Sequence, residues 1–163
     1  MNNIEQEYSF KVRSINPFLK YCKDNGFKKL EKTEQIRTLY KKSDKTMLRL
    51  TIKKCGRKVI KEMDFKQDKL SDDPFIERKG SLPISYTDDE AVYSIIDFLG
   101  YKKDVELIRT RYVYEKKDVK VEIDDYISPN KMLVVSIEGN ANGSKKLYYE
   151  LTEKYNQYLF KEE

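Results

Sequence analysis

The sequence predicts an α+β domain in which a closed antiparallel β-barrel carries helices on its outer side. Several segments alternate between polar and apolar residues with the period of a strand. The chain contains 13 tyrosines and 7 phenylalanines, which favour strands. Three further segments have the start and stop signals of helices. A chain of 163 residues is long enough for one domain and short for two, so residues 1–163 are expected to form a single domain.

The first predicted strand, residues 4–13, has one apolar and one polar face. Ile4, Tyr8 and Phe10 alternate with Glu5 and Glu7, and the alternation continues to residue 13. Similar strands are predicted at about 34–42, 46–54, 58–66, 105–116, 118–126 and 132–138. Several of them are joined by short polar turns, so most neighbouring strands should be antiparallel.

Helix signals occur at three places. Asn16 and Pro17 begin the first helix, and Asn25-Gly26 ends it. Thr87-Asp88 caps a second helix that runs to about residue 99, and a third is predicted over about 143–160. The leucines and tyrosines of the third helix recur at helical spacing, which is typical of core packing. Residues 67–74 form the most hydrophilic connection.

The chain also contains an internal repeat. Residues 25–29, Asn-Gly-Phe-Lys-Lys, precede Ile36-Arg37-Thr38, and residues 99–103, Leu-Gly-Tyr-Lys-Lys, precede Ile108-Arg109-Thr110. The glycine-to-isoleucine separation differs by two residues between the copies, which preserves the strand face of each side chain. The repeat predicts a barrel built from two related halves, although chance similarity in a lysine-rich chain is the alternative.

Alternate residues of the predicted strands place a set of charged and polar side chains on one face. This face contains Glu5, Glu7, Ser9, Lys11, Arg13, Arg37, Arg49, Lys53, Arg109, Arg111, Lys120, Glu122, Asp124, Ser136 and Glu138. One interpretation is an open sheet whose charged face is simply solvated. The other is a water-filled tunnel, because three amphipathic helices need the apolar faces for packing and would turn the charged faces inward.

Two features of the charged face favour a bound ligand. Glu5 and Glu7 lie on the first strand and Asp124 and Glu138 near the end of the chain, and between them lie Arg37, Arg49, Arg109 and Arg111. Carboxylates two residues apart on a strand are about 7 Å apart, and a bound cation would relieve their repulsion. Clustered guanidinium groups suit a polyanion, because each can hold phosphate oxygens in bidentate fashion.

Composition excludes several classes of site. The chain has no histidine, and its two cysteines are not spaced as metal ligands. A metal would therefore be held by oxygen atoms, which favours Mg²⁺ or Mn²⁺. The net charge of +5 does not by itself indicate nucleic-acid binding. Neither an export signal nor a long apolar stretch is recognised, so we expect a soluble, cytoplasmic protein that does not bind membranes.

Six short motifs resemble, in order, those of one known family. They are Glu5-Gln6-Glu7-Tyr8-Ser9-Phe10-Lys11, Gln35-Ile36-Arg37-Thr38-Leu39-Tyr40, Leu48-Arg49-Leu50-Thr51, Arg109-Thr110-Arg111, Val121-Glu122-Ile123-Asp124 and Ser136-Ile137-Glu138. The family is that of the CYTH domains, or triphosphate tunnel metalloenzymes, which includes class IV adenylate cyclases, thiamine triphosphatases and inorganic triphosphatases. The resemblance extends over nearly the whole chain.

The chain departs from the motifs of this family at several positions. Ser9 occupies the place of a lysine, for which Lys11 could partly substitute, and Arg37 replaces an acidic or amide residue. Thr51 replaces the second arginine of the Leu-Arg-x-Arg element, and Ser136 replaces the first of two closing glutamates. An acidic element expected before the second helix is not recognisable around residues 77–79.

The resemblance implies a closed eight-stranded antiparallel tunnel with a divalent-metal-dependent triphosphatase activity. It implies that Lys11, Arg37, Arg49, Arg109 and Arg111 bind the triphosphate. It also implies that Glu5, Glu7, Asp124 and Glu138 ligate Mg²⁺ or Mn²⁺. The substrate would be inorganic triphosphate or a nucleoside or thiamine triphosphate, and no catalytic base is assigned.

Three alternatives stay open at this stage. The protein could be an adenylate cyclase of the same family, although no adenine pocket is recognised. It could be an inactive protein that binds a triphosphate, polyphosphate or an RNA 5′-triphosphate end, because Ser9, Thr51 and Ser136 remove charges from the site. It could also be a structural barrel whose inner charges pair with one another. A monomer and a homodimer are equally compatible with the sequence.

Overall fold

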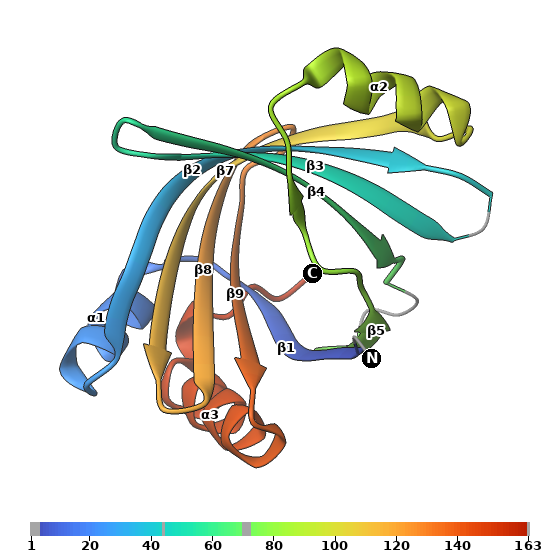
Figure 1. The fold of residues 1–163 in the computed structure, drawn as a ribbon. Coiled ribbons are helices and arrows are strands. Elements are labelled where there is room, and N and C mark those ends of the chain that lie inside the picture. The colour runs from blue at the N-terminus through green and yellow to red at the C-terminus, as the bar shows by residue number, and fades with distance from the viewer. Residues whose placement is uncertain (1–3, 44, 70–72, 163) are drawn as a thin grey trace.

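The computed structural model describes residues 4–43, 45–69 and 73–162 as one curled antiparallel sheet with helices on its convex side (Figure 1). The strands are β1 (Ile4–Val12), β2 (Lys28–Lys41), β3 (Thr46–Cys55), β4 (Lys58–Gln67), β5 (Phe75–Lys79), β6 (Ile84–Ser85), β7 (Lys102–Lys116), β8 (Val119–Ser128) and β9 (Met132–Gly139). The helices are α1 (Asn16–Asp24), α2 (Asp89–Phe98) and α3 (Ala141–Lys154), followed by a short 3₁₀ turn, η1 (Asn156–Tyr158).

The nine strands form one sheet in the order β5-β1-β9-β8-β7-β2-β3-β4-β6. The α+β class and the antiparallel pairing are confirmed, but the closed eight-stranded barrel is wrong. The sheet is a curled half-barrel with two edges, and the chain between β5 and β6 passes from one edge to the other. There, the Ser81 amide donates to the Phe65 carbonyl, and Lys66 forms an isolated bridge with Gly80. The edges are thus linked by a few contacts instead of a continuous strand ladder.

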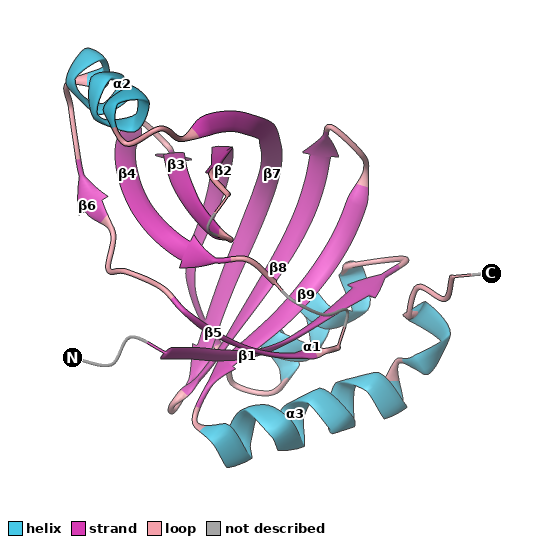
Figure 2. Ribbon diagram, turned by 90° about the vertical axis from the view of Figure 1, so that its right-hand side faces the viewer, coloured by secondary structure: helices cyan, strands magenta, loops and turns pink. Residues whose placement is uncertain are grey.

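The helices pack against the apolar face of the sheet from outside (Figure 2). Phe18 and Tyr21 of α1 and Leu147 of α3 share one core cluster with Tyr114 of β7 and with apolar residues of β8 and β9. A second, smaller cluster joins α2 to β3 and β4. Because both clusters use the apolar strand faces, the charged faces are left on the concave side, as the sequence predicts.

The sheet order agrees with the predicted repeat. Strands β2, β3 and β4 mirror β7, β8 and β9 about the central β2–β7 pair, where Ile36 lies opposite Ile108. Gly26 and Gly100 follow α1 and α2 and have φ angles of +76° and +81°, a backbone conformation that glycine adopts without a steric penalty. The two copies of the repeat therefore meet at the middle of the sheet.

Some element boundaries differ from the predicted ones. Strand β2 begins at Lys28, about six residues before the predicted start, because its first half extends the ladder with β7 despite a bulge. Helix α3 ends at Lys154 instead of near residue 160. The predicted connection at 67–74 lies partly outside the described residues. No helix in the described ranges is long and apolar enough to cross a membrane.

Candidate functional site

A tunnel runs along the concave face of the sheet, and successive inward-facing residues line its successive sections. On β1, Glu5 lines the first section, Glu7 the second and Lys11 the third. Strand β8 follows the same order from Lys120 to Tyr126, and β9 runs through it in the opposite direction. Adjacent sections share lining residues, so the three hollows follow one another along the concave face, and we call this series of hollows the tunnel.

We name the three sections for their positions. The acidic mouth is lined by Ile4, Glu5, Gln6, Glu77, Glu115, Asp118, Lys120, Glu138 and Gly139. The tail mouth is lined by Ser9, Phe10, Lys11, Lys69, Pro74, Tyr126, Met132, Val134, Phe160 and Glu162. Between them lies the central section, a cavity of about 440 Å³, within the range of small-molecule sites.

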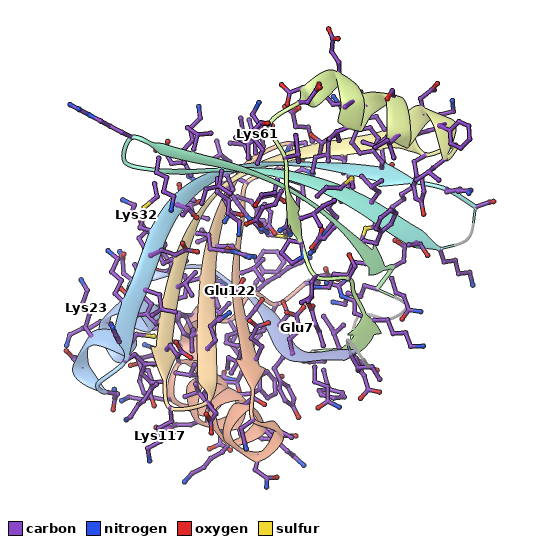
Figure 3. The ribbon with its side chains drawn as sticks, in the orientation of Figure 1. Glu7, Lys23, Lys32, Lys61, Lys117 and Glu122 are labelled. Carbon is purple, nitrogen blue, oxygen red and sulfur yellow. The ribbon has the colours of Figure 1, made fainter. Side chains whose placement is uncertain are left out.

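The central section is lined mainly by charged side chains. Its basic residues are Arg37, Arg49, Lys53, Lys66, Lys69, Arg78, Arg109, Arg111 and Lys120. Its acidic residues are Glu5, Glu7, Glu62, Asp64, Glu122, Asp124 and Glu138. Nine basic and seven acidic groups leave an excess of two positive charges. Figure 3 shows Glu7 and Glu122 on the concave side of the sheet, whereas Lys23 and Lys117 lie outside it.

Each of the seven carboxylates is paired with a basic group. The closest network joins Arg111 to Asp124 through two hydrogen bonds of 2.7 and 2.9 Å and to Glu122. The other pairs are Arg49–Asp64, Lys53–Glu62, Lys66–Glu5, Arg78–Glu7, Lys120–Glu138 and Arg109–Asp124. The inner charges therefore satisfy one another to a large extent, as the structural-barrel alternative requires.

Arg37 is the main exception to this pairing. Its Nε donates to Thr51 Oγ1 at 3.0 Å, and within the described part of the chain it forms no ion pair with a carboxylate. Burial lowers the pKa of Arg37 well below its ordinary value, and the nearby charges of Arg109, Arg49 and Arg111 lower it further. A guanidinium among three others is stabilised by an anion, so this arginine cluster is a candidate anion site. Lys69 likewise has no ion-pair partner among the described residues.

Arg109 is held in place by groups that the sequence analysis did not assign to the site. Gln35 Oε1 accepts hydrogen bonds from Nε and Nη2 of Arg109 at 3.0 and 2.8 Å. Tyr126 Oη accepts a third bond, from Nη1, at 2.8 Å. Gln35 and Arg109 are almost completely buried. The signal for Gln35 was present, because it shares the strand face of Arg37.

The acidic side of the central section contains a crowded group of carboxylates. Glu7 and Glu138 are direct partners across β1 and β9. Burial and the negative charge of Glu122 raise the pKa of Glu138 to about 7, although Lys120 opposes the shift. Burial alone would raise the pKa of Glu122 as well, but Arg111 and Arg109 lower it to about 2. Glu122 was on the predicted face but was not predicted as a ligand.

The four predicted metal ligands are only partly brought together. Among the residues that the structure places, no group of three or more His, Cys, Asp or Glu side chains is arranged to hold a metal ion. Asp124 is engaged by Arg111, and Glu5 by Lys66. Glu7 and Glu138 fit a divalent cation best, because they are direct register partners, although Arg78 and Lys120 also pair with them.

Four of the five predicted phosphate ligands lie together, and the fifth lies apart from them. Arg37, Arg49, Arg109 and Arg111 all line the central section. Lys11 has the same parity but lies at the tail mouth, where its Nζ is 3.9 Å from Glu162 and its side chain is half-exposed. The structure thus assembles four of the five and places Lys11 apart from them.

Comparison with known proteins connects this tunnel to a group of solved structures. No family model and no curated protein matches the sequence. The PH1012 protein from Pyrococcus horikoshii OT3 superposes with a TM-score of 0.70 and 19% identity over 91% of this chain and 88% of its own. HpAC1 from Hippeastrum is a candidate adenylyl cyclase described as having a dominant triphosphatase activity. It superposes with a TM-score of 0.67 and 10% identity over 92% of this chain and 87% of its own.

The predicted resemblance to CYTH domains is confirmed at the level of the fold. Structures similar to this chain include HpAC1 and two further proteins described as candidate adenylate cyclases. A chain of the Schizosaccharomyces pombe Mediator head module has the same fold, with a TM-score of 0.66 and 10% identity over 96% of both chains. At such identities the fold is shared, but the activity must be argued from the site.

Proposed function

We propose that the central section binds a triphosphate and hydrolyses it in the presence of Mg²⁺ or Mn²⁺. The observation that carries this proposal is the environment of Arg37, a partly buried arginine next to three other arginines with a hydroxyl group as its hydrogen-bond partner. A polyanion would supply Arg37 with the opposite charge that it lacks, whereas the other three arginines already have carboxylate partners. The fold similarity to a protein with triphosphatase activity supports the same ligand class.

The residues of the site would divide the work between the two sides of the tunnel. Arg37 and Arg109 would hold phosphate oxygens, and Arg49 and Arg111 would contribute charge while they remain paired with Asp64 and Asp124. Glu7 and Glu138 would hold a divalent ion that enters as the metal complex of the triphosphate. That ion would neutralise phosphate charge during transfer to water.

A protein that binds a triphosphate without turnover is the second candidate. It is favoured by the ion pairs of the four predicted metal ligands, all of which are engaged by a basic group before any metal arrives. Ser9, Thr51 and Ser136 also lie in the central section where the related motifs have charged groups. Fewer charges mean weaker stabilisation of the transferring phosphoryl group.

Phosphate release and thermal stability together separate these candidates. The purified protein would be incubated with tripolyphosphate, ATP or thiamine triphosphate, with and without Mg²⁺ or Mn²⁺. Metal-dependent release of phosphate supports hydrolysis, and formation of cyclic AMP with pyrophosphate would indicate a cyclase instead. A rise in melting temperature without turnover supports the binding protein, because a ligand of the native state stabilises it. The absence of any response would contradict both candidates.

A further inference from the structure

The two mouths of the tunnel differ in charge and in apolar content. The acidic mouth has five carboxylates against Lys120 alone. The tail mouth has two lysines, Lys11 and Lys69, against Glu162. It also has an apolar wall with three aromatic rings: Phe10, Pro74, Tyr126, Met132, Val134 and Phe160. A triphosphate that carries an organic group at one end would therefore distinguish between the two directions.

The C-terminal segment fixes an aromatic ring at the tail mouth. The amide of Phe160 donates to the carbonyl of Lys11 at 3.0 Å, and Leu159 forms a bridge with Val12. The amide of Arg13 donates to the Tyr158 carbonyl at 2.7 Å. These bonds hold the segment against the end of β1, while 51% of Phe160 stays exposed. The backbone bonds thus place Phe160 at the tail mouth, where its side chain is accessible to a planar ligand.

Tyr126 connects this mouth to the arginine cluster. Its hydroxyl group accepts a hydrogen bond from Arg109, and the guanidinium lies 5.5 Å from the centre of its ring. Tyr126 lines both the central section and the tail mouth. A ligand whose phosphates reach Arg109 would therefore place its next group beside Tyr126 and near Phe160.

We infer that the ligand is a nucleoside triphosphate that lies with its phosphates at the arginine cluster and its base at the tail mouth, stacked on Phe160. This inference rests on the proposed function. Stacking on an aromatic ring suits every base, because each has a π face. Lys11 and Lys69, which line the tail mouth, would repel a cationic ring such as that of thiamine. Bare tripolyphosphate would fill the arginine cluster and leave Phe160 unused.

Titration calorimetry with non-hydrolysable ligands tests the inference. The ligands are β,γ-imido ATP and diimidotriphosphate, both with Mg²⁺, and the variants are Phe160→Ala and Phe98→Ala. Phe98 is a matched control, because it is an aromatic residue exposed on α2 and does not line the tunnel. We expect the ATP analogue to bind the parent protein about tenfold more tightly than the inorganic ligand. Phe160→Ala should remove that advantage without changing the affinity for the inorganic ligand, and Phe98→Ala should change neither affinity.

The outcomes separate the inference from the proposed function. Equal affinities for the two ligands in the parent protein, or an unchanged affinity for the ATP analogue in Phe160→Ala, would overturn the inference while the triphosphate site stands. Thiamine triphosphate that displaces the ATP analogue at equal concentration would also overturn it. Failure of both ligands to bind would overturn the proposed function itself.

Discussion

Arg37 is the residue on which the proposed site depends most, because its charge has no carboxylate partner among the described residues. We expect Arg37→Gln to weaken tripolyphosphate binding about 10- to 100-fold, the usual range for lost hydrogen bonds to a charged group. The melting temperature should not fall, because the variant removes a positive charge that lies near those of three other arginines. Calorimetry and thermal unfolding measure both effects. Arg57→Gln, in the exposed turn between β3 and β4, is the control, and an equal loss of affinity in both variants would contradict the assignment.

Substitution of Arg111, unlike that of Arg37, should lower the stability of the protein, because Arg111 is the ion-pair partner of two interior carboxylates. Removal of its side chain in Arg111→Ala leaves Asp124 and Glu122 without their closest cation. Breaking a buried pair in this way costs about 3–5 kcal/mol of unfolding free energy. Urea unfolding measures the loss. Lys103→Ala, which removes an exposed pair with Glu106, should change the stability little, and an equally stable Arg111→Ala would contradict the network.

The raised pKa of Glu138 predicts that the stability of the protein depends on pH. Its pKa is about 7 in the folded protein and near 4.5 when unfolded. Between these values the folded state holds a proton that the unfolded state has lost, so the Glu138 contribution to stability falls as pH rises from about 5 to 7. Glu138→Gln should flatten this part of the profile. Urea unfolding at pH 5 and pH 7 checks it, and the same slope in parent and variant would exclude Glu138 as its source.

Strand parity predicted which side chains enter the tunnel, but not which of them meet. It placed Arg37, Arg49, Arg109 and Arg111 on one face, because alternate residues of a strand share a face whatever the curvature. It could not show that Lys11 lies beyond the central section, since position along the tunnel depends on how the sheet curls. The pairing of Asp124 with Arg111 depends on the register of β7 and β8, which the sequence does not contain directly.

At the scale of elements, β1 and β9 carry two departures from the family motifs directly opposite each other. Ser9 is the register partner of Ser136, and the hydroxyl of Ser136 donates to that of Ser9 at 3.3 Å. The related motifs have a lysine and a glutamate at these two positions. The two hydroxyl groups leave neither strand with an unmatched charge at these positions.

A double-mutant cycle tests whether these two substitutions are coupled. Ser9→Lys and Ser136→Glu should each lower stability when made alone, because each adds one unmatched charge to the tunnel. The double variant should be more stable than the sum of the two effects by about 0.5–3 kcal/mol. Denaturant unfolding of all four proteins gives this coupling. Strictly additive effects would show that the two positions do not interact, and a gain in phosphate release by the double variant would show that the missing charges limit turnover.

The long strands and the helices were predictable, whereas β5 and β6 were not. The long strands alternate over many residues because one face packs under helices. Residues 75–85 show no such alternation, since β5 has five residues and β6 has two, and neither lies under a helix cluster. These short strands also decide how the sheet edges meet. The error in strand number and the error in closure thus have one origin.

At the scale of the whole molecule, fold similarity persists where sequence similarity is slight. PH1012 and HpAC1 match this chain with 19% and 10% identity. What this chain itself requires is an apolar convex face for α1, α2 and α3 and a polar concave face, and many sequences meet that requirement. The positions of individual charges are less constrained, which is why the fold was easier to predict than the pairing inside the tunnel.

The central claim is that the concave charged face is a triphosphate site. A crystal structure of the protein soaked with tripolyphosphate and Mn²⁺ tests it most directly. We predict phosphate density in contact with Arg37 and Arg109, with the anomalous signal of manganese near Glu7 and Glu138. A central section that contains neither ion, with its ion pairs unchanged at saturating ligand, would contradict the claim and leave the tunnel as a structural network of paired charges.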